Sequence, residues 1–201
     1  MSMRSRSLGV AGAFALCLAA SPVTAQDAPT AALDAPTAPV AVLPVVLYTE
    51  QANVQEATDT GMAALADSVL AGKLTELLGA QLVPPARCAA AVVARHDATC
   101  SAVVACARAV ARTVGARWVV LVKVSKTSNL IWLFTGQLVH VPDGRIVLDD
   151  STELKGEPDG MVRAGTRIFA ERVTRTVRAG GVTTNFPNGA PEAANTQAGS
   201  R

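Results

Sequence analysis

The sequence predicts a single α/β (α+β) domain, in which helices pack on a mixed sheet that ends in an antiparallel meander. Three runs rich in β-branched and aromatic residues follow one another, at Trp118–Val124, Leu130–His140 and from Arg145 onward. Pro142-Asp143-Gly144 has turn chemistry, because Pro presets φ, Asp can bond its own backbone and Gly accepts a positive φ. Helix-like segments flank these runs, so the predicted order is β-α-β-α-β-β-β-α.

Two further strands are predicted in the first half of the domain. Val40–Tyr48 is apolar and β-branched, but Pro44 within it has no N–H to donate, which predicts an edge position or a bulge. Gln81–Val83 is expected to form a short second strand that stops at Pro84-Pro85.

Helical spacing of apolar residues predicts a helix over Met62–Leu78, after a loop at Thr49–Gly61. Asp59 or Thr60 is the expected N-cap, and Gly79 the expected stop. The Ala-rich stretch Arg87–Arg95 predicts a short second helix.

The two remaining helices are expected at Ser101–Val114, capped by Ser101 and stopped by Gly115, and at Gly160–Arg178, capped by Asp159. The last helix has an expected apolar arc of Met161, Val162, Ile168, Phe169 and Val173. Arg172 falls within this arc, so it should reach solvent along its aliphatic stem or meet a carboxylate.

The amino terminus has the features of a signal peptide. Arg4 and Arg6 precede the apolar stretch Leu8–Ala20, Pro22 breaks that stretch, and small residues precede a cleavage site after Ala25. We therefore expect a protein exported to the periplasm, with no transmembrane segment in the mature chain. Cys17 follows Leu16, which a lipoprotein signal does not tolerate, so it should be lost with the signal. The expected divisions are a signal at 1–25, a disordered Ala/Pro-rich leader at 26–39, the domain at 40–179 and a disordered tail at 180–201.

Export to an oxidising compartment favours a disulfide among the three remaining cysteines. We predict a Cys100–Cys106 bond, which requires Cys100 to precede the helix because residues six apart in a helix point to different sides. A Cys88–Cys100 bond is the alternative. A zinc site of these three cysteines with His96 has wider spacing than zinc motifs use, so no metal is expected.

No catalytic constellation is evident, and neither an enzymatic activity nor a cofactor is expected. The two histidines, His96 and His140, have no serine or cysteine at the spacing of a known triad. The acidic run Asp149–Asp159 lacks the alternating ligands of a calcium loop. A net charge of +2 and 3% aromatic residues give no basis for nucleic-acid binding.

Several motifs resemble those of known families. One run is similar to the TolB amino-terminal and CsgG-like periplasmic domains. It begins at Cys100-SAVVA-Cys106, continues through Gly115 to the strand that starts at Trp118, and ends at LVHVPDGRIV. Lys123-Val124-Ser125, Asn129-Leu130-Ile131 and the helix opening resemble more closely a family of uncharacterised exported bacterial proteins. The residues of that opening are Gly156, Asp159, Arg163 and Gly165, while Met161 departs from the aromatic residue expected there. The resemblance implies the fold and no established activity.

The polar residues shared with that family form the predicted partner surface. They are Lys123, Ser125, Lys126 and Asn129 at one turn, and Asp159 and Arg163 at the start of the last helix. With no catalytic set in view, the expected function is a non-enzymatic domain of the envelope that binds or assembles with an unknown periplasmic or envelope protein. The alternative is a small-ligand-binding accessory protein of a periplasmic oxidation or envelope system.

Overall fold

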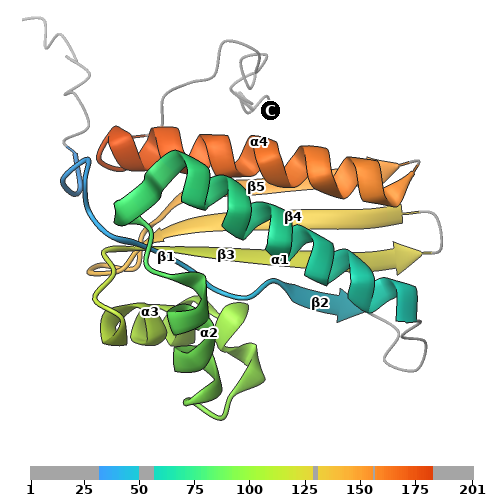
Figure 1. Ribbon diagram of the computed structural model, residues 1–201, viewed down its shortest axis with the longest axis horizontal. Helices are drawn as coiled ribbons and strands as arrows, with labels where there is room; N and C mark the ends of the chain where they lie inside the picture. The colour runs from blue at the N-terminus through green and yellow to red at the C-terminus, as the bar shows by residue number, and fades with distance from the viewer. Residues whose placement is uncertain (1–31, 50–56, 129–130, 156, 183–201) are drawn as a thin grey trace, which may run out of the picture.

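The structure, a computed structural model, describes residues 32–49, 57–128, 131–155 and 157–182. It forms a mixed five-stranded sheet with helices on both faces, which confirms the predicted fold class (Figure 1). Its strands are β1 (Val40–Val42), β2 (Val46–Thr49), β3 (Trp118–Ser128), β4 (Ile131–His140) and β5 (Ile146–Lys155). The order across the sheet is β1-β3-β4-β5, with β2 paired to β3 beyond β1. The predicted antiparallel meander is therefore β3-β4-β5.

The prediction for Pro44 is confirmed. The expected first strand divides there into β1 and β2, both of which run parallel to β3 at the edge of the sheet. Val40 pairs with Trp118 and Val46 with Lys123, so the edge chain uses one more residue than β3 between these two points. The missing N–H of Pro44 is accommodated by this bulge.

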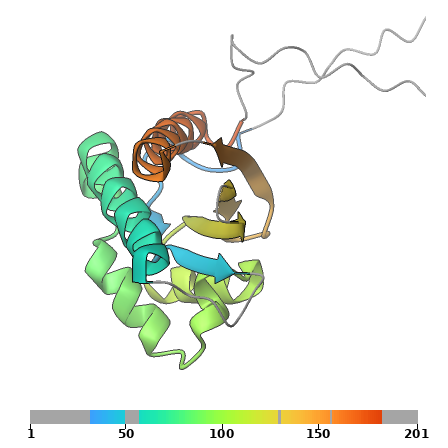
Figure 2. The ribbon, with the colours of Figure 1, turned by 90° about the vertical axis from the view of Figure 1, so that its right-hand side faces the viewer.

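Two long helices cover the first face of the sheet. They are α1 (Ala57–Leu78) and α4 (Pro158–Arg178), which lie side by side on one side of the strands in both views (Figure 2). The rings of Phe134 and Phe169 meet edge-on between sheet and helix, with centroids 5.7 Å apart. Gly136 makes room for this contact, because a Cβ there would lie 2.6 Å from the Phe169 ring.

Two short helices cover the second face. They are α2 (Pro85–Val93) and α3 (Val104–Thr113), joined by the 3-10 turn η2 (Ala98–Ser101). Their buried side chains are small and pack against Val119, Leu121 and Val139 of the sheet. Figure 1 shows both helices gathered beneath β1 and the start of β3, while the strands run on past them.

The expected second strand at Gln81–Val83 is wrong. Residues Gly79–Gln81 form a 3-10 turn, η1, and only a single bridge joins Leu82 to Val40. Pro84 and Pro85 follow immediately, and since neither has an N–H, the ladder cannot continue. Because this strand is missing and the first one is split, the observed order is β-β-α-α-α-β-β-β-α.

The starts of α1 and α3 also differ from the prediction. Helix α1 begins at Ala57, so Asp59 and Thr60 lie inside it and cannot be its N-cap. Ser101 does not cap α3, which begins at Val104; it lies buried in η2. Gly79 and Gly115 do follow their helices, with φ of 54° and 78°.

Helix α4 is capped two residues earlier than expected. The carboxylate of Glu157 accepts a hydrogen bond from the Gly160 N–H at 2.8 Å, and Asp159 lies in the first turn instead. Met161 and Ile168 of the expected apolar arc are exposed, whereas Val162, Phe169 and Val173 are buried. The buried side is filled out by Thr166, Ala170, Thr174, Thr176 and Val177, which apolar periodicity alone does not select. The prediction for Arg172 is confirmed, since it donates to Asp150 at 2.5 Å.

The two ends of the described chain meet beside the start of β3. The Leu33 N–H donates to the Gly180 carbonyl at 2.6 Å, and Ala38 is buried. The folded part thus extends beyond the expected 40–179 at both ends, because backbone hydrogen bonds hold residues 32–39 in spite of their Ala/Pro-rich composition. The expected signal peptide and its cleavage site, most of the expected tail and Asn129 lie outside the described residues.

No helix within the described residues combines the length and the apolar character that a bilayer-spanning segment requires.

Candidate functional site

Strand alternation divides the predicted partner surface between the two faces of the sheet. Lys123 and Ser125 point to the second face, on the same side as Leu121 of the α2/α3 core. Lys126 points to the opposite, first face of the sheet. Its ammonium lies 5.7 Å from the centre of the Trp132 ring, which belongs to the core between the sheet and helices α1 and α4. Ser125 is buried, so only Lys123 of the first pair offers its side chain to a partner.

Asp159 and Arg163 are exposed in the first two turns of α4, on the first face. Figure 1 places the start of α4 at the same end of the molecule as the tip of β3, where Lys126 lies. The five of these predicted residues that the structure describes therefore lie toward one end of the fold, but the sheet separates Lys123 and Ser125 from Lys126 and from the helix start.

The second face continues beyond α2 and α3 as an uncovered stretch of sheet, which we call the open face. Strand register and parity assign its residues: Val46, Tyr48, Lys123, Ser125, Leu133, Thr135, Gln137, Asp149, Ser151 and Glu153. Tyr48 is 51% exposed, and Asp149, Ser151 and Glu153 are also exposed. Four neighbouring strands thus present a rigid, mainly polar surface that no described helix covers.

A small hollow marks the inner border of the open face, where η2 meets the sheet. It has a volume of about 60 Å³ and is lined by Ser101, Ala102, Leu121, Lys123, Thr135 and Gln137. Lys123 brings the positive charge to this hollow, and the hydroxyl and amide groups around it can both donate and accept hydrogen bonds. A carboxylate of a partner is the chemical group that such a lining suits best.

The surroundings of Lys123 hold its ammonium in place. It lies 5.6 Å from the centre of the Tyr48 ring, within the range of a cation–π interaction. Gln137 on the other side of the hollow donates to Asp149 at 3.2 Å. The cation and the amide are therefore set on adjacent strands, β3 and β4, rather than on a loop.

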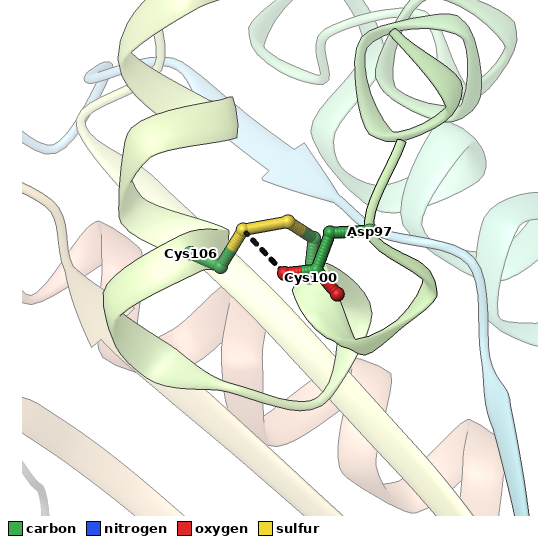
Figure 3. Close-up of side chains that lie close together, drawn as sticks. All are labelled: Asp97, Cys100 and Cys106. Carbon is green, nitrogen blue, oxygen red and sulfur yellow. Dashed lines mark hydrogen bonds between the residues drawn. A yellow bond between two sulfur atoms is a disulfide. The ribbon is translucent and has the colours of Figure 1, made fainter. Parts of the chain in front are cut away.

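The loop that precedes α3 carries the cysteines. The structure joins Cys100 to Cys106 as a disulfide, with Cα atoms 4.7 Å apart, and Cys100 lies in η2 ahead of the helix as the predicted pairing requires (Figure 3). Cys88 on α2 is buried and has no disulfide partner. The same turn contributes Ser101 and Ala102 to the hollow, so the bond anchors one wall of it.

Asp97 lies beside this disulfide. Among the described residues, its carboxylate is the potential metal ligand that the structure brings close to the two sulfur atoms. Its Oδ2 is 4.0 Å from Cys106 Sγ (Figure 3), and hydrogen bonds from the Thr99 side chain and backbone lower the pKa of Asp97. With both sulfurs in the disulfide, no thiolate is available as a ligand. Among the described residues, the groups that lie together are Asp97, Cys100 and Cys106, so Cys88 and His96 do not join the cysteines as the alternative zinc site requires.

His140 lies between two carboxylates. Its Nδ1 is 2.8 Å from Asp143 and its Nε2 is 3.5 Å from Asp34, and the ring packs against Trp118 at 4.8 Å between centroids. Both ring nitrogens therefore face acids, whereas a triad histidine faces a hydroxyl or thiol nucleophile with one of them. Burial raises the pKa of the Cys88 thiol, which is typical of an unreactive cysteine.

Comparison with known proteins places this fold in a family. A family model, DUF3280, described as a protein of unknown function (DUF2380), matches residues 38–173. The chain belongs to the DUF3280 family. The matched range covers every strand, α1 to α3 and most of α4. The predicted resemblance to an uncharacterised family is thus confirmed at this level. No curated protein matches the chain.

Solved structures similar to this DUF3280 domain share little sequence with it. The LpoB C-terminal domain from Salmonella enterica is 18% identical over 59% of this chain and 84% of its own, with a TM-score of 0.42. PelC from Paraburkholderia phytofirmans, a dodecamer, is 18% identical over 73% and 91%, also with a TM-score of 0.42. TolB from Acinetobacter baumannii is 12% identical over 74% of this chain and 30% of its own, with a TM-score of 0.40. The predicted relation to CsgG stays a prediction.

Sequence reasoning did not assemble the open face of the DUF3280 domain. The sequence pattern indicates Lys123 and Ser125 but not Tyr48, Thr135 and Gln137, because these lie on two other strands, β2 and β4, whose pairing with β3 the sequence does not specify. One signal was available: Leu133, Thr135 and Gln137 alternate with the apolar Trp132, Phe134 and Leu138. That alternation indicates a strand with one face in contact with solvent.

Proposed function

We propose that this protein is an exported, non-enzymatic domain of the cell envelope that binds a partner protein on its open face. The observation that supports this proposal is that the α2/α3 layer stops halfway along the sheet and leaves a rigid polar surface with Lys123 in a hollow at its inner border. Strands hold binding groups more precisely than loops do, so such a surface suits recognition. The partner is expected to place a carboxylate against Lys123.

The sequence supports the compartment. Arg4 and Arg6 before an apolar stretch, with cleavage after Ala25, direct the chain to the periplasm. The intact mass of the protein purified from periplasm should then correspond to a chain that starts at Gln26. A full-length or diacylated species would contradict export by this route.

Site-specific photocrosslinking tests the surface. A photoreactive phenylalanine analogue at Thr135, in the open face, should capture one protein in living cells. The same analogue at Ile168, which is exposed on α4 at the first face, is the matched control and should not capture it. Mass spectrometry of the crosslinked product identifies the partner.

Charge reversal tests the chemistry. Lys123→Glu should abolish the Thr135 crosslink, whereas Lys126→Glu with Arg163→Glu, on the other face, should preserve it. Exposed substitutions usually change stability by no more than about 0.5 kcal/mol, so circular dichroism should show intact folds. Loss of the partner in the double variant alone would move the surface to the first face and overturn this assignment. Saturable turnover of a periplasmic substrate by the purified protein would overturn the non-enzymatic role.

A further inference from the structure

A second hollow lies in the α2/α3 layer. It has a volume of about 420 Å³ and lies between α2 and the carboxyl end of α3. Its lining consists of Arg87, Ala91, Ala94, Arg95, Thr113 and Val114. Arg87 and Ala91 lie one turn apart on the same side of α2, and Arg95 lies in the turn that follows the end of this helix at Val93. Two arginines therefore flank a floor of small apolar side chains.

Neither arginine has a counter-ion in the described part of the chain. Arg87 and Arg95 are exposed, and their side chains make no hydrogen bond or ion pair with a described residue, although their backbone N–H groups donate to Pro84 and Val92. Other arginines of the fold do have partners: Arg108 donates to the Val141 and Pro142 carbonyls, Arg117 to Asp34, and Arg172 to Asp150. The side chains of Arg163 and Arg167 also have no partner among the described residues. They are exposed on α4 and line neither of the two hollows.

The α2/α3 layer carries an excess of positive charge. Residues 85–115 contain four arginines, at positions 87, 95, 108 and 112, and a single acidic residue, Asp97. Helix α4, on the opposite face of the sheet, has the same excess, with five arginines against Asp159 and Glu171, while the whole chain has a net charge of only +2. A partner that approaches this layer therefore meets a local positive field that the overall charge conceals.

The spacing of the two guanidinium groups restricts the geometry of a ligand. From Arg87 to the end of α2 at Val93 the helix rises about 9 Å, at about 1.5 Å per residue, and Arg95 follows in the next turn, so the two arginines are roughly 12 Å apart. In an extended peptide, residues four apart lie on the same side and span about 13 Å, at about 3.3 Å per residue. Two acidic side chains four residues apart on an extended segment therefore match the two arginines, with the small side chains between them over Ala91 and Val114.

We propose that the hollow formed by Arg87, Ala91, Arg95 and Val114 is a binding site for an extended acidic segment of a partner protein. Each guanidinium binds one carboxylate, and the apolar floor accepts the aliphatic parts of the segment. This site lies in the helical layer, away from the open face, so it goes beyond the proposed function and does not depend on it.

Fluorescence anisotropy tests the site on the folded protein. The probe is a fluorescein-labelled heptapeptide of serines with glutamates at its second and sixth positions. Saturable binding at low salt is expected, weakened at least tenfold by Arg87→Glu or Arg95→Glu and strongly reduced by added salt. Arg167→Glu makes the same charge change on α4 and is expected to alter the affinity by less than twofold.

A second peptide, with glutamates at adjacent positions, tests the spacing and should bind at least fivefold more weakly. An equal loss of peptide affinity in the Arg95→Glu and Arg167→Glu variants would overturn the proposal, because it would indicate that the peptide is attracted only by the overall charge of the protein. Equal binding of both peptides, or no binding of either, would overturn it as well. Sedimentation with anionic vesicles that requires Arg87 and Arg95, without peptide binding, would assign the site to a membrane surface instead. Circular dichroism melts confirm that each variant is folded.

Discussion

The two helical layers of this protein differ in extent and in composition. Helices α1 and α4, of 22 and 21 residues, run along the length of the first face, whereas α2 and α3, of 9 and 10 residues, lie only over one end of the second. The first core contains Trp118, Phe134 and Phe169, while the second is built from Ala, Val, Leu and Cys. The long layer thus supplies most of the buried apolar area and therefore most of the stability.

The short layer has what the long layer lacks. It carries the disulfide, the hollow between Arg87 and Arg95 and the border of the open face. Because a layer of small side chains contributes less hydrophobic stabilisation, it depends more on covalent and polar anchoring. Both of the proposed binding surfaces lie in or beside the short layer, where helical cover of the sheet is incomplete.

Phe169→Ala should have the largest effect on stability. Phe169 is 1% exposed and packs against Phe134 and above Gly136, so its truncation should cost about 3–5 kcal/mol of the unfolding free energy. Val110→Ala, at a fully buried position of α3, is the matched change in the short layer and should cost about 2 kcal/mol. Urea denaturation measures both, and a larger loss in Val110→Ala would reverse the assignment of the main core.

Removal of the disulfide should come next. In the chain-entropy treatment, a bond that closes a loop of seven residues contributes about 2 kcal/mol, so Cys100→Ser with Cys106→Ser should cost roughly that amount. Hydrogen exchange should increase in α2 and α3 and stay unchanged in α4, because only the short layer is anchored by this bond.

Peptide mapping without reductant checks the pairing itself. A Cys100–Cys106 peptide and a free Cys88 are expected from the structure. A Cys88–Cys100 peptide would show the alternative pairing, and alkylation of all three thiols without reductant would exclude both bonds.

Asp34 should give a smaller, pH-dependent effect where the two chain ends meet. Although burial raises the pKa of Asp34, hydrogen bonds from Arg117 and from the Ala35 N–H outweigh it, so the pKa lies below its ordinary value of 3.8. A carboxyl with a lowered pKa stabilises the fold above its unfolded pKa, and this stabilisation is lost as the pH falls through the folded value. Asp34→Asn should therefore cost up to about 1 kcal/mol at pH 7.

The pH profile separates this electrostatic effect from a packing defect. The stability difference between the wild-type protein and Asp34→Asn should narrow as the pH falls below 3.8. Thermal melts between pH 7 and pH 3 measure it, and a difference that stays constant over this range would contradict the role of the Asp34 charge.

The smallest expected effect concerns the start of α4. Glu157→Ala should cost about 0.5 kcal/mol through loss of its hydrogen bond to the Gly160 N–H, while Glu157→Gln keeps an acceptor and should cost less. If Asp159→Ala costs more than Glu157→Ala, the cap predicted from the sequence would be the correct one.

The sequence by itself determined the elements whose signals are local. The β-branched runs around the Pro142-Asp143-Gly144 turn predicted the meander, helical periodicity predicted α1, α3 and α4, and Pro44 predicted the bulge at the edge. These signals are local because strand and helix periods, turn residues and proline geometry act within a few residues of chain. The Cys100–Cys106 pairing was also predicted from the sequence, since it depends only on where the next helix begins.

The tertiary structure decided which elements meet and which surfaces stay uncovered. Strand register assigned Lys123 to one face and Lys126 to the other, and the packing of α4 exposed Ile168 while burying Thr166 and Thr174. The length of α2 and α3 relative to the strands left the open face uncovered, and the approach of α2 to the end of α3 formed the hollow between Arg87 and Arg95. These outcomes depend on contacts between segments far apart in the chain, which no local pattern encodes.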